Sequence, residues 1–173
     1  HGDLTQCIYG VDKDKQAVEV ARLNLLLRAL HQKEKLPMLA NIREGDSLIS
    51  GTPEELKEAF GEGWKEKKAF NWEKEFADVF KQQTSEEQTS EVSETSEVLS
   101  ARSGGFDIII GNPPYVRQET LGEKFKSYAQ KKFTTYAGTA DLYIYFIERA
   151  MSLLKPNGLF GFKLLTTEPF SEK

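Results

Sequence analysis

The clearest chemical pattern in the sequence is the run Asn112–Tyr115, which reads Asn-Pro-Pro-Tyr and directly follows an apolar segment. Pro113 and Pro114 cannot donate to a strand ladder, so the strand must end there with its carbonyls held in fixed directions. The side-chain oxygen of Asn112 beside a backbone carbonyl offers two acceptors for one NH2 group, and Tyr115 offers a flat ring for stacking. The pattern indicates a receptor for a planar amine or amide. A plain Pro-Pro turn with a packed tyrosine is the simpler alternative.

Two aspartates follow other apolar runs. Asp12 comes directly after Cys7–Val11, where a carboxylate can accept two hydrogen bonds from a ribose diol or can cap the next helix. Asp46 lies in the turn Gly45–Leu48, where it can accept a hydrogen bond from the exocyclic amine of a nucleoside or from its own backbone. From position alone, both the binding role and the structural role stay open at each aspartate.

Other catalytic classes lack their residues. Gly45–Leu48 spells the Gly-Asp-Ser-Leu motif of certain serine esterases, but no histidine follows Ser47 to act as its base. The single cysteine, Cys7, excludes an intramolecular disulfide, and two histidines, His1 and His31, are too few for a histidine-ligated metal centre. We therefore expect no metal.

Length and composition bound the fold. The chain has 173 residues, enough for one domain with a buried core, and its net charge is −4. No apolar run approaches the roughly 20 residues of a membrane helix, and the first residues do not resemble a signal peptide. We expect a cytoplasmic protein.

Apolar runs alternate with helical patterns, which predicts an α/β fold with a mainly parallel sheet and ligands at the carboxyl ends of the strands. The run Phe106–Gly111 is almost wholly apolar, which is typical of a buried central strand. Aromatic residues within 64–81 indicate a further packed helix. The expected strands are Cys7–Val11, Met38–Arg43, Phe106–Gly111 and Leu159–Leu165, and the expected helices are Lys13–Leu30, Pro53–Phe60 and Leu142–Leu154.

Two segments differ from this pattern. Residues 82–105 are rich in Ser, Thr and Glu, which predicts a disordered, low-complexity insertion that ends in a hinge at Gly104 and Gly105. Residues 116–138 combine basic and aromatic side chains. That mixture is typical of a nucleic-acid contact surface, although a solvated loop whose aromatics reach the core explains it almost as well.

The chemical motifs and their flanks resemble one enzyme family. Residues Phe106–Glu119 are similar to the catalytic motif of adenine-specific DNA methyltransferases, in particular the restriction–modification type in which methylase and nuclease share one chain. Thr139–Ala150 and Leu153–Gly158 resemble the segment that follows in the same family. Tyr9–Asp12 and Gly45–Leu48 resemble its cofactor motifs. The similarity covers about residues 7–50 and 106–165.

The resemblance implies a class I, Rossmann-like methyltransferase sheet with helices on both faces and S-adenosylmethionine as cofactor. Asp12 would bind the cofactor ribose, Asp46 its adenine, and Ser47 would lie near that ring. The resemblance also implies that Asn112 contacts the cofactor as well as the target base. The implied reaction is methylation of the N6 amine of an adenine that is flipped out of duplex DNA. The implied catalytic residues are Asn112, Pro113, Pro114 and Tyr115.

The sequence also departs from the family pattern. The Gly-rich cofactor loop and the first strand should precede Tyr9, and further strands and a target-recognition domain should follow Phe160–Lys163. We therefore expect residues 1–173 to be a partial catalytic domain whose partners are duplex DNA and the rest of a larger enzyme, and which is inactive alone. Three alternatives remain: a protein glutamine methyltransferase, an RNA base methyltransferase, and a non-catalytic scaffold or binding fragment.

Overall fold

The computed structural model describes residues 7–31, 39–81 and 104–163, which fall into two compact units, His1–Phe76 and Ala77–Lys173. Each unit is described by itself. The predicted insertion lies mostly outside the described residues, because these exclude 82–103. In the described part of the chain, no helix combines the length and apolar content that a membrane span requires.

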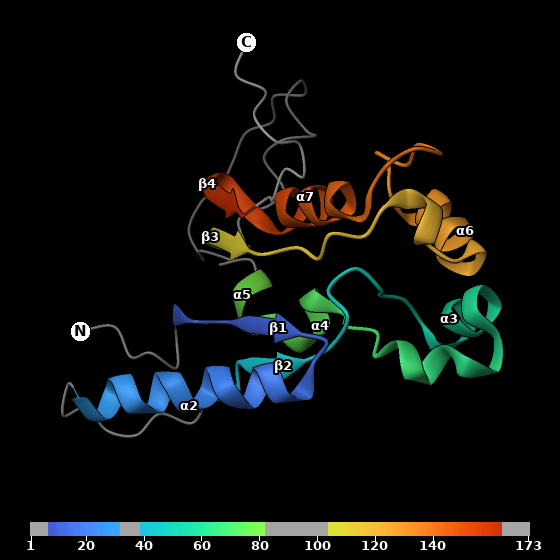
Figure 1. The fold of residues 1–173 in the computed structure, drawn as a ribbon. Helices are drawn as coiled ribbons and strands as arrows, with labels where there is room; N and C mark the ends of the chain where they lie inside the picture. The colour runs from blue at the N-terminus through green and yellow to red at the C-terminus, as the bar shows by residue number, and fades with distance from the viewer. Residues whose placement is uncertain (1–6, 32–38, 82–103, 164–173) are drawn as a thin grey trace, which may run out of the picture. The chain divides into compact units, whose positions relative to one another are not determined.

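The first unit begins with a strand, a helix and a strand, as predicted. Strand β1 (Gly10–Asp12) pairs in parallel with β2 (Ile42–Glu44), and α2 (Lys15–His31) connects them. The strands are shorter than expected. Figure 1 shows α2 running alongside the two strands. Only part of its broad apolar surface is buried, since four apolar side chains remain more than half exposed: Val20, Leu23, Leu27 and Leu30.

The helix α3 (Pro53–Phe60) begins where the sequence predicts. Thr52 caps it by accepting a hydrogen bond from the backbone of Glu55, and the Glu55 carboxylate accepts one from the backbone N–H of Thr52. After the predicted end of this helix at Phe60, the chain does not leave helical structure but continues as the 3₁₀ helix η1 (Gly61–Lys67). A tighter turn therefore continues the chain beyond the predicted boundary.

The aromatic segment 64–81 does not form the single helix that we expected. It contains the 3₁₀ residues of η1 and two helices of four residues each, α4 (Trp72–Glu75) and α5 (Ala77–Phe80). Phe76, which directly follows α4, packs against two other rings. Its ring centroid lies 5.4 Å from that of Phe70 and 5.0 Å from that of Tyr9. The aromatics thus form a cluster across separate segments rather than one helical face.

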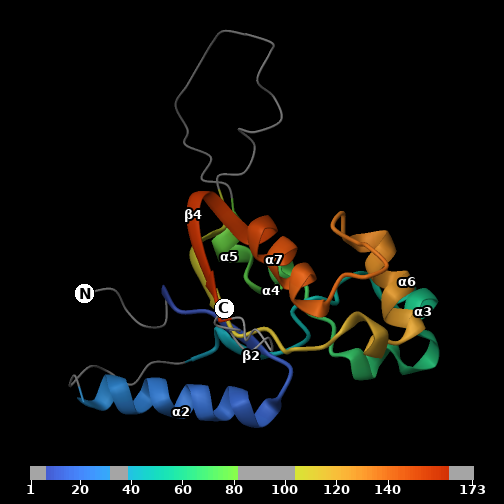
Figure 2. The ribbon, with the colours of Figure 1, turned by 45° about the horizontal axis from the view of Figure 1, so that its top comes forward.

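The second unit contains another parallel pair, β3 (Phe106–Gly111) with β4 (Leu154–Phe162), against which α7 (Leu142–Leu153) packs. The bounds of β3 are those predicted, and α7 matches within one residue. Strand β4 begins five residues before the expected Leu159, and the register shifts after Phe106, so that Asn157, whose φ is 64°, lies inside β4. Figure 2 shows β4 leading directly out of α7.

The expected burial of β3 is wrong on one of its faces. Ile108 is 64% exposed and Ile110 is 82% exposed, and their neighbour Leu159 on β4 is 67% exposed. A Cβ atom placed on Gly161, which pairs with Ile110, would meet nothing within 4 Å. Because side chains alternate along a strand, these residues share one face, and no described helix covers it.

Sequence reasoning missed a helix in the basic segment, α6 (Glu123–Lys132), which is preceded by the short 3₁₀ helix η2 (Gln118–Thr120). Tyr128 and Phe133 are buried, and Tyr145 on α7 is only 1% exposed and lies 5.1 Å from Phe133. Burial raises the pKa of Tyr145, and the nearby Tyr136 and Glu148 add to this effect. The aromatics of this segment therefore build the core between α6 and α7.

The glycines of the expected hinge are held tightly. The N–H of Gly105 donates to the carbonyl of Val79 at 3.0 Å. A Cβ on Gly104 would lie 2.8 Å from the backbone of Phe80, and one on Gly105 would lie 2.8 Å from the carbonyl oxygen of Leu153. These positions are glycine because two stretches of backbone approach too closely for a side chain.

The loop between α6 and α7 is anchored by a single carboxylate. Glu148 accepts hydrogen bonds from the backbone and hydroxyl of Thr134 and from the backbone and hydroxyl of Thr135, at 2.6–3.0 Å. Partial burial alone would raise the pKa of Glu148, but these hydrogen bonds outweigh it and lower the pKa below its usual value.

We expect Glu148→Gln to lower the free energy of unfolding of this unit by about 1 kcal/mol at pH 7, because an amide cannot accept all four hydrogen bonds. A group whose pKa is lowered by folding stabilises the protein above its unfolded pKa, about 4.3 for glutamate, and loses that effect as the pH falls. The stability difference between wild type and variant, measured by urea denaturation, should therefore shrink below about pH 4. A difference that stays constant from pH 7 to pH 3 would contradict this role.

Candidate active site

The first unit brings Asp12 and Asp46 to the same end of its sheet. Asp12 is the last residue of β1, and Asp46 follows two residues after Glu44, with which Asp12 is paired in register. The N–H of Gly45 donates to the carbonyl of Asp12 at 2.9 Å. The carboxyl ends of both strands thus carry an acidic side chain, as the sequence predicted.

Asp12 has a structural role that leaves one oxygen available. Its Oδ1 accepts the N–H of Asp14 at 2.8 Å, and Asp14 in turn accepts the N–H of Gln16 in the first turn of α2. Asp14, rather than Asp12, therefore caps the helix directly. Within the described ranges, Oδ2 of Asp12 accepts no hydrogen bond, so capping and ligand binding can coexist at this exposed residue.

Asp46 uses both carboxylate oxygens within the protein. Oδ1 accepts the N–H of Leu48 at 3.1 Å, which is the structural role in the turn that the sequence left open for Asp46. Oδ2 accepts a hydrogen bond from Nζ of Lys13 at 3.0 Å, and the Asp46 side chain is 14% exposed. Lys13, which sequence reasoning did not single out, therefore covers the oxygen that an incoming amine would need.

The turn after β2 is supported by a segment to which the sequence assigned no role. A Cβ on Gly45 would lie 2.6 Å from the Phe70 ring, so the ring packs directly on the backbone. The N–H of Asp46 donates to the carbonyl of Lys68 at 2.7 Å, and Nε1 of Trp72 donates to the carbonyl of Ser47 at 3.1 Å. Residues 68–72 thus hold the half-buried Ser47 and its neighbours in place.

In the second unit, the run Asn112–Tyr115 directly follows β3. The carbonyl of Gly111 accepts the N–H of Lys163 at 3.0 Å, and the carbonyl of Pro114 accepts the N–H of Val116 at 3.1 Å. Within the described part of the chain, neither the Asn112 side chain nor the carbonyl of Pro113 accepts a hydrogen bond. The two acceptors that the sequence assigned to an amine therefore have no hydrogen-bond partner in the described residues, while the carbonyls of Gly111 and Pro114 do.

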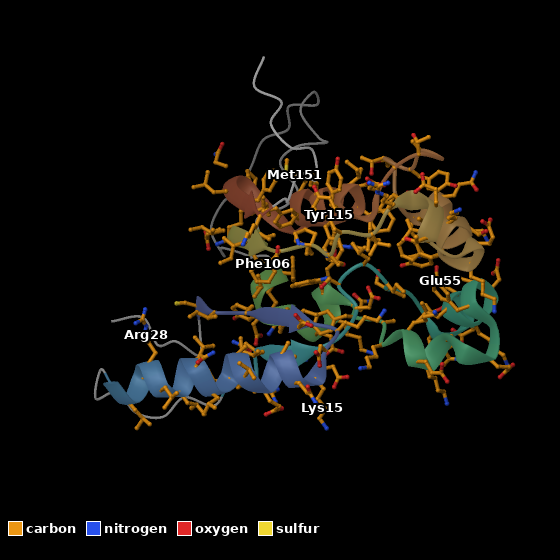
Figure 3. The ribbon with its side chains drawn as sticks, viewed as in Figure 1. Lys15, Arg28, Glu55, Phe106, Tyr115 and Met151 are labelled. Carbon is orange, nitrogen blue, oxygen red and sulfur yellow. The ribbon has the colours of Figure 1, made fainter. Side chains whose placement is uncertain are left out.

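The side chains of this turn differ in burial. Pro113 is buried, whereas Asn112 and Pro114 are exposed. The Tyr115 side chain is 44% exposed, and its ring stacks on Tyr143 with 6.4 Å between centroids and 27° between planes. Figure 3 shows Tyr115 beside α7, the helix that carries Tyr143. The turn presents a polar amide and an accessible aromatic face.

The basic side chains of α6 are engaged within the protein. Lys126 pairs with Glu123 at 3.1 Å, and Lys124, Lys131 and Lys132 also have interaction partners. Among the described residues, no group of three or more His, Cys, Asp or Glu side chains is arranged to hold a metal ion. The candidate chemistry therefore rests on the two acidic turns and on Asn112–Tyr115.

The sequence of the chain matches the model of a known protein family. The model of the Eco57I restriction-modification methylase family matches residues 6–170. The chain belongs to this family. The match spans both units and includes every candidate site residue.

Curated relatives match shorter or longer parts of the chain. The type II methyltransferase M.BstVI of Geobacillus stearothermophilus is 43% identical over 56 residues, or 32% of this chain, and M.XhoI of Xanthomonas vasicola is 46% identical over 57 residues, or 33%. The type II restriction enzyme and methyltransferase RM.Eco57I of Escherichia coli is 28% identical over 93% of this chain. The chain spans only 10–14% of the length of these relatives.

The bonds of Asp12 separate its structural role from a binding role. Asp12→Asn keeps a side-chain oxygen for the N–H of Asp14, so we expect the melting temperature to stay within about 2 °C of wild type. Asp12→Ala removes that acceptor and should cost about 1 kcal/mol of unfolding free energy. Thermal denaturation of the two variants checks this. Equal destabilisation by both would show that charge, rather than the hydrogen bond, is what matters at this turn.

Proposed function

We propose that this chain is catalytic sequence of an adenine-specific DNA methyltransferase, which transfers a methyl group from S-adenosylmethionine to the N6 amine of a flipped adenine in duplex DNA. The single observation that carries this proposal is the pair of open acceptors at Asn112 and Pro113 beside the accessible ring of Tyr115. Membership of the Eco57I restriction-modification methylase family and the similarity to type II methyltransferases support it.

The open acceptors suit an aromatic amine. An N6 amine has two N–H groups, and the Asn112 side-chain oxygen and the Pro113 carbonyl can accept one each. Accepting both draws the nitrogen lone pair out of conjugation and directs it toward an electrophile. Because neither acceptor titrates near neutral pH, this activation needs no histidine or other general base, consistent with the two histidines of the sequence.

The target base must leave the duplex to reach these acceptors, since its amine is paired inside the helix. A flipped base loses its stacking neighbours, and an exposed aromatic ring can replace one of them. Tyr115 is the aromatic residue next to the acceptors, and 44% of its side chain is exposed. It would therefore hold the base flat while Asn112 and Pro113 hold its amine.

The acidic turns of the first unit fit a nucleoside cofactor. When bound, S-adenosylmethionine supplies an electrophilic methyl group. The available Oδ2 of Asp12 suits a ribose hydroxyl, and Asp46 with Ser47 suits the amine edge of an adenine. Asp46 fits this role only if Lys13 releases its Oδ2. The parallel pairs, each ending in a candidate residue, are consistent with a class I, Rossmann-like methyltransferase pattern.

We expect Asn112→Ala to lower kcat at least a hundredfold, because an oriented acceptor that acts in the transition state contributes on the order of 3 kcal/mol. The measurement is methylation of duplex DNA by the natural protein that carries this sequence, followed by mass spectrometry of N6-methyladenine. Cofactor affinity should hardly change, which provides the internal control.

Parallel assays on RNA and on a glutamine-containing release-factor peptide distinguish the alternatives. Methylation of either one in place of DNA would overturn the proposed substrate. Near wild-type DNA methylation by Asn112→Ala would instead show that Asn112–Tyr115 is only a turn.

The Lys13–Asp46 contact makes a separate prediction for cofactor binding. Asp46→Asn places an amide donor near the position of Oδ2, so we expect the affinity for S-adenosylmethionine to fall about tenfold or more. Lys13→Gln frees Oδ2 from an exposed ion pair and should strengthen binding by up to about fivefold. Isothermal titration calorimetry on the natural protein measures both. Weaker binding by Lys13→Gln would mean that Lys13 contacts the cofactor itself.

A further inference from the structure

A second aromatic residue accompanies Tyr115. The ring of Tyr143 lies 6.4 Å from that of Tyr115 between centroids, with 27° between the ring planes. This separation lies within the range of interacting aromatic pairs, and the small angle makes the contact a stack rather than an edge contact. Within the described ranges, Tyr115 makes no hydrogen bond and stacks with no other ring.

A backbone hydrogen bond joins the two segments that carry these rings. The N–H of Leu142 donates to the carbonyl of Val116 at 3.1 Å, and these residues are the direct neighbours of Tyr143 and Tyr115. The first turn of α7 is therefore tied to the chain immediately after the Asn-Pro-Pro-Tyr turn. A movement of α7 would move the Tyr143 ring with it.

Helix α7 is itself firmly held. Two residues after Tyr143, Tyr145 is 1% exposed and packs 6.0 Å from Phe125 and 5.1 Å from Phe133, between ring centroids. One turn further on, Glu148 accepts the four hydrogen bonds from the loop that precedes α7. Tyr143 thus belongs to a rigid helix, whereas Tyr115 belongs to an irregular turn with an accessible side chain.

We propose that Tyr143 is a positioning residue for the target base: by stacking on Tyr115, it fixes the plane of the ring on which the base lies. A stacked base is held parallel to its platform, so a rotation of Tyr115 would turn the amine away from Asn112 and Pro113. Tyr143 acts on the base through Tyr115. This inference rests on the proposed function, which names the base and the acceptors but assigns no role to α7.

The test uses the natural protein. The DNA sequence that the wild type methylates is mapped first, and a duplex that contains this sequence then serves as the substrate. Tyr143→Leu keeps apolar bulk but removes the ring. We expect it to lower kcat/KM for DNA about tenfold through kcat, with KM for the cofactor unchanged. Tyr143→Phe keeps the stacking ring and should restore activity to within about twofold of wild type.

Two further variants separate positioning from general stability. Ile147→Ala removes a half-buried apolar side chain from the same helix and should leave kcat within about twofold of wild type, although the melting temperature falls. The double variant Tyr115→Ala with Tyr143→Leu should be no worse than Tyr115→Ala alone, because Tyr143 acts through the ring that is already gone. Additive losses would overturn the positioning role.

Base stacking is measured directly with 2-aminopurine in place of the target adenine, since its fluorescence rises when it leaves the duplex and falls when it stacks on a ring. Tyr143→Leu should give stronger emission than wild type at saturating protein. Wild-type emission together with wild-type kcat in Tyr143→Leu would overturn the inference while adenine methylation still stood. No adenine methylation by the wild-type protein would overturn the proposed function itself, and this inference with it.

Discussion

A strand fixes its residues through a ladder of backbone hydrogen bonds, and every candidate residue here lies where such a ladder ends. The turn beyond each of these strand ends is held by another segment. Phe70 packs on the backbone at Gly45, which holds the turn that contains Asp46. Leu142 bonds to Val116 and holds the exit from Asn112–Tyr115. Both contacts join segments more than 20 residues apart in sequence, so the precision of the turns depends on tertiary packing.

The turns at Asn112 and at Asp46 differ in whether their side-chain oxygens already have hydrogen-bond partners. Around Asn112 the carbonyls of Gly111 and Pro114 are satisfied, while the Asn112 amide oxygen and the Pro113 carbonyl accept no hydrogen bond within the described residues. At Asp46 both carboxylate oxygens are already engaged, by Leu48 and Lys13. A ligand that needs either oxygen would have to displace one of these partners. The first arrangement favours orientation of a neutral group, and the second makes occupancy dependent on the position of one lysine side chain.

The local parts of this fold could be read from the sequence. Proline fixes the end of β3 after Gly111, and the Thr52 cap with Pro53 fixes the start of α3, because these signals act within a few residues. The candidate residues were located for the same reason. Helix α6 was missed because its core-facing Tyr128 lies among lysines that dominate the composition of the segment.

Contacts between distant segments could not be read in this way. Nothing in the sequence pairs Phe70 with Gly45, Lys13 with Asp46 or the ring of Tyr143 with Tyr115, since each depends on how separate elements pack. The burial of β3 was wrong for a related reason. An apolar run indicates that a strand is suited to a buried position. The exposure of Ile108, however, depends on which other elements pack on it.

One face of β3 and β4 is apolar and exposed in the described part of the chain. Ile108, Ile110 and Leu159 form a flat, β-branched and leucine-rich surface, and the small Gly161 beside them leaves the backbone approachable. An exposed apolar patch of this kind is suited to pack against another apolar surface. Replacing Ile110, the most exposed of these side chains, with lysine would introduce a charge at the centre of that surface. The most exposed side chain of this face therefore lies only two positions before Asn112 along the chain.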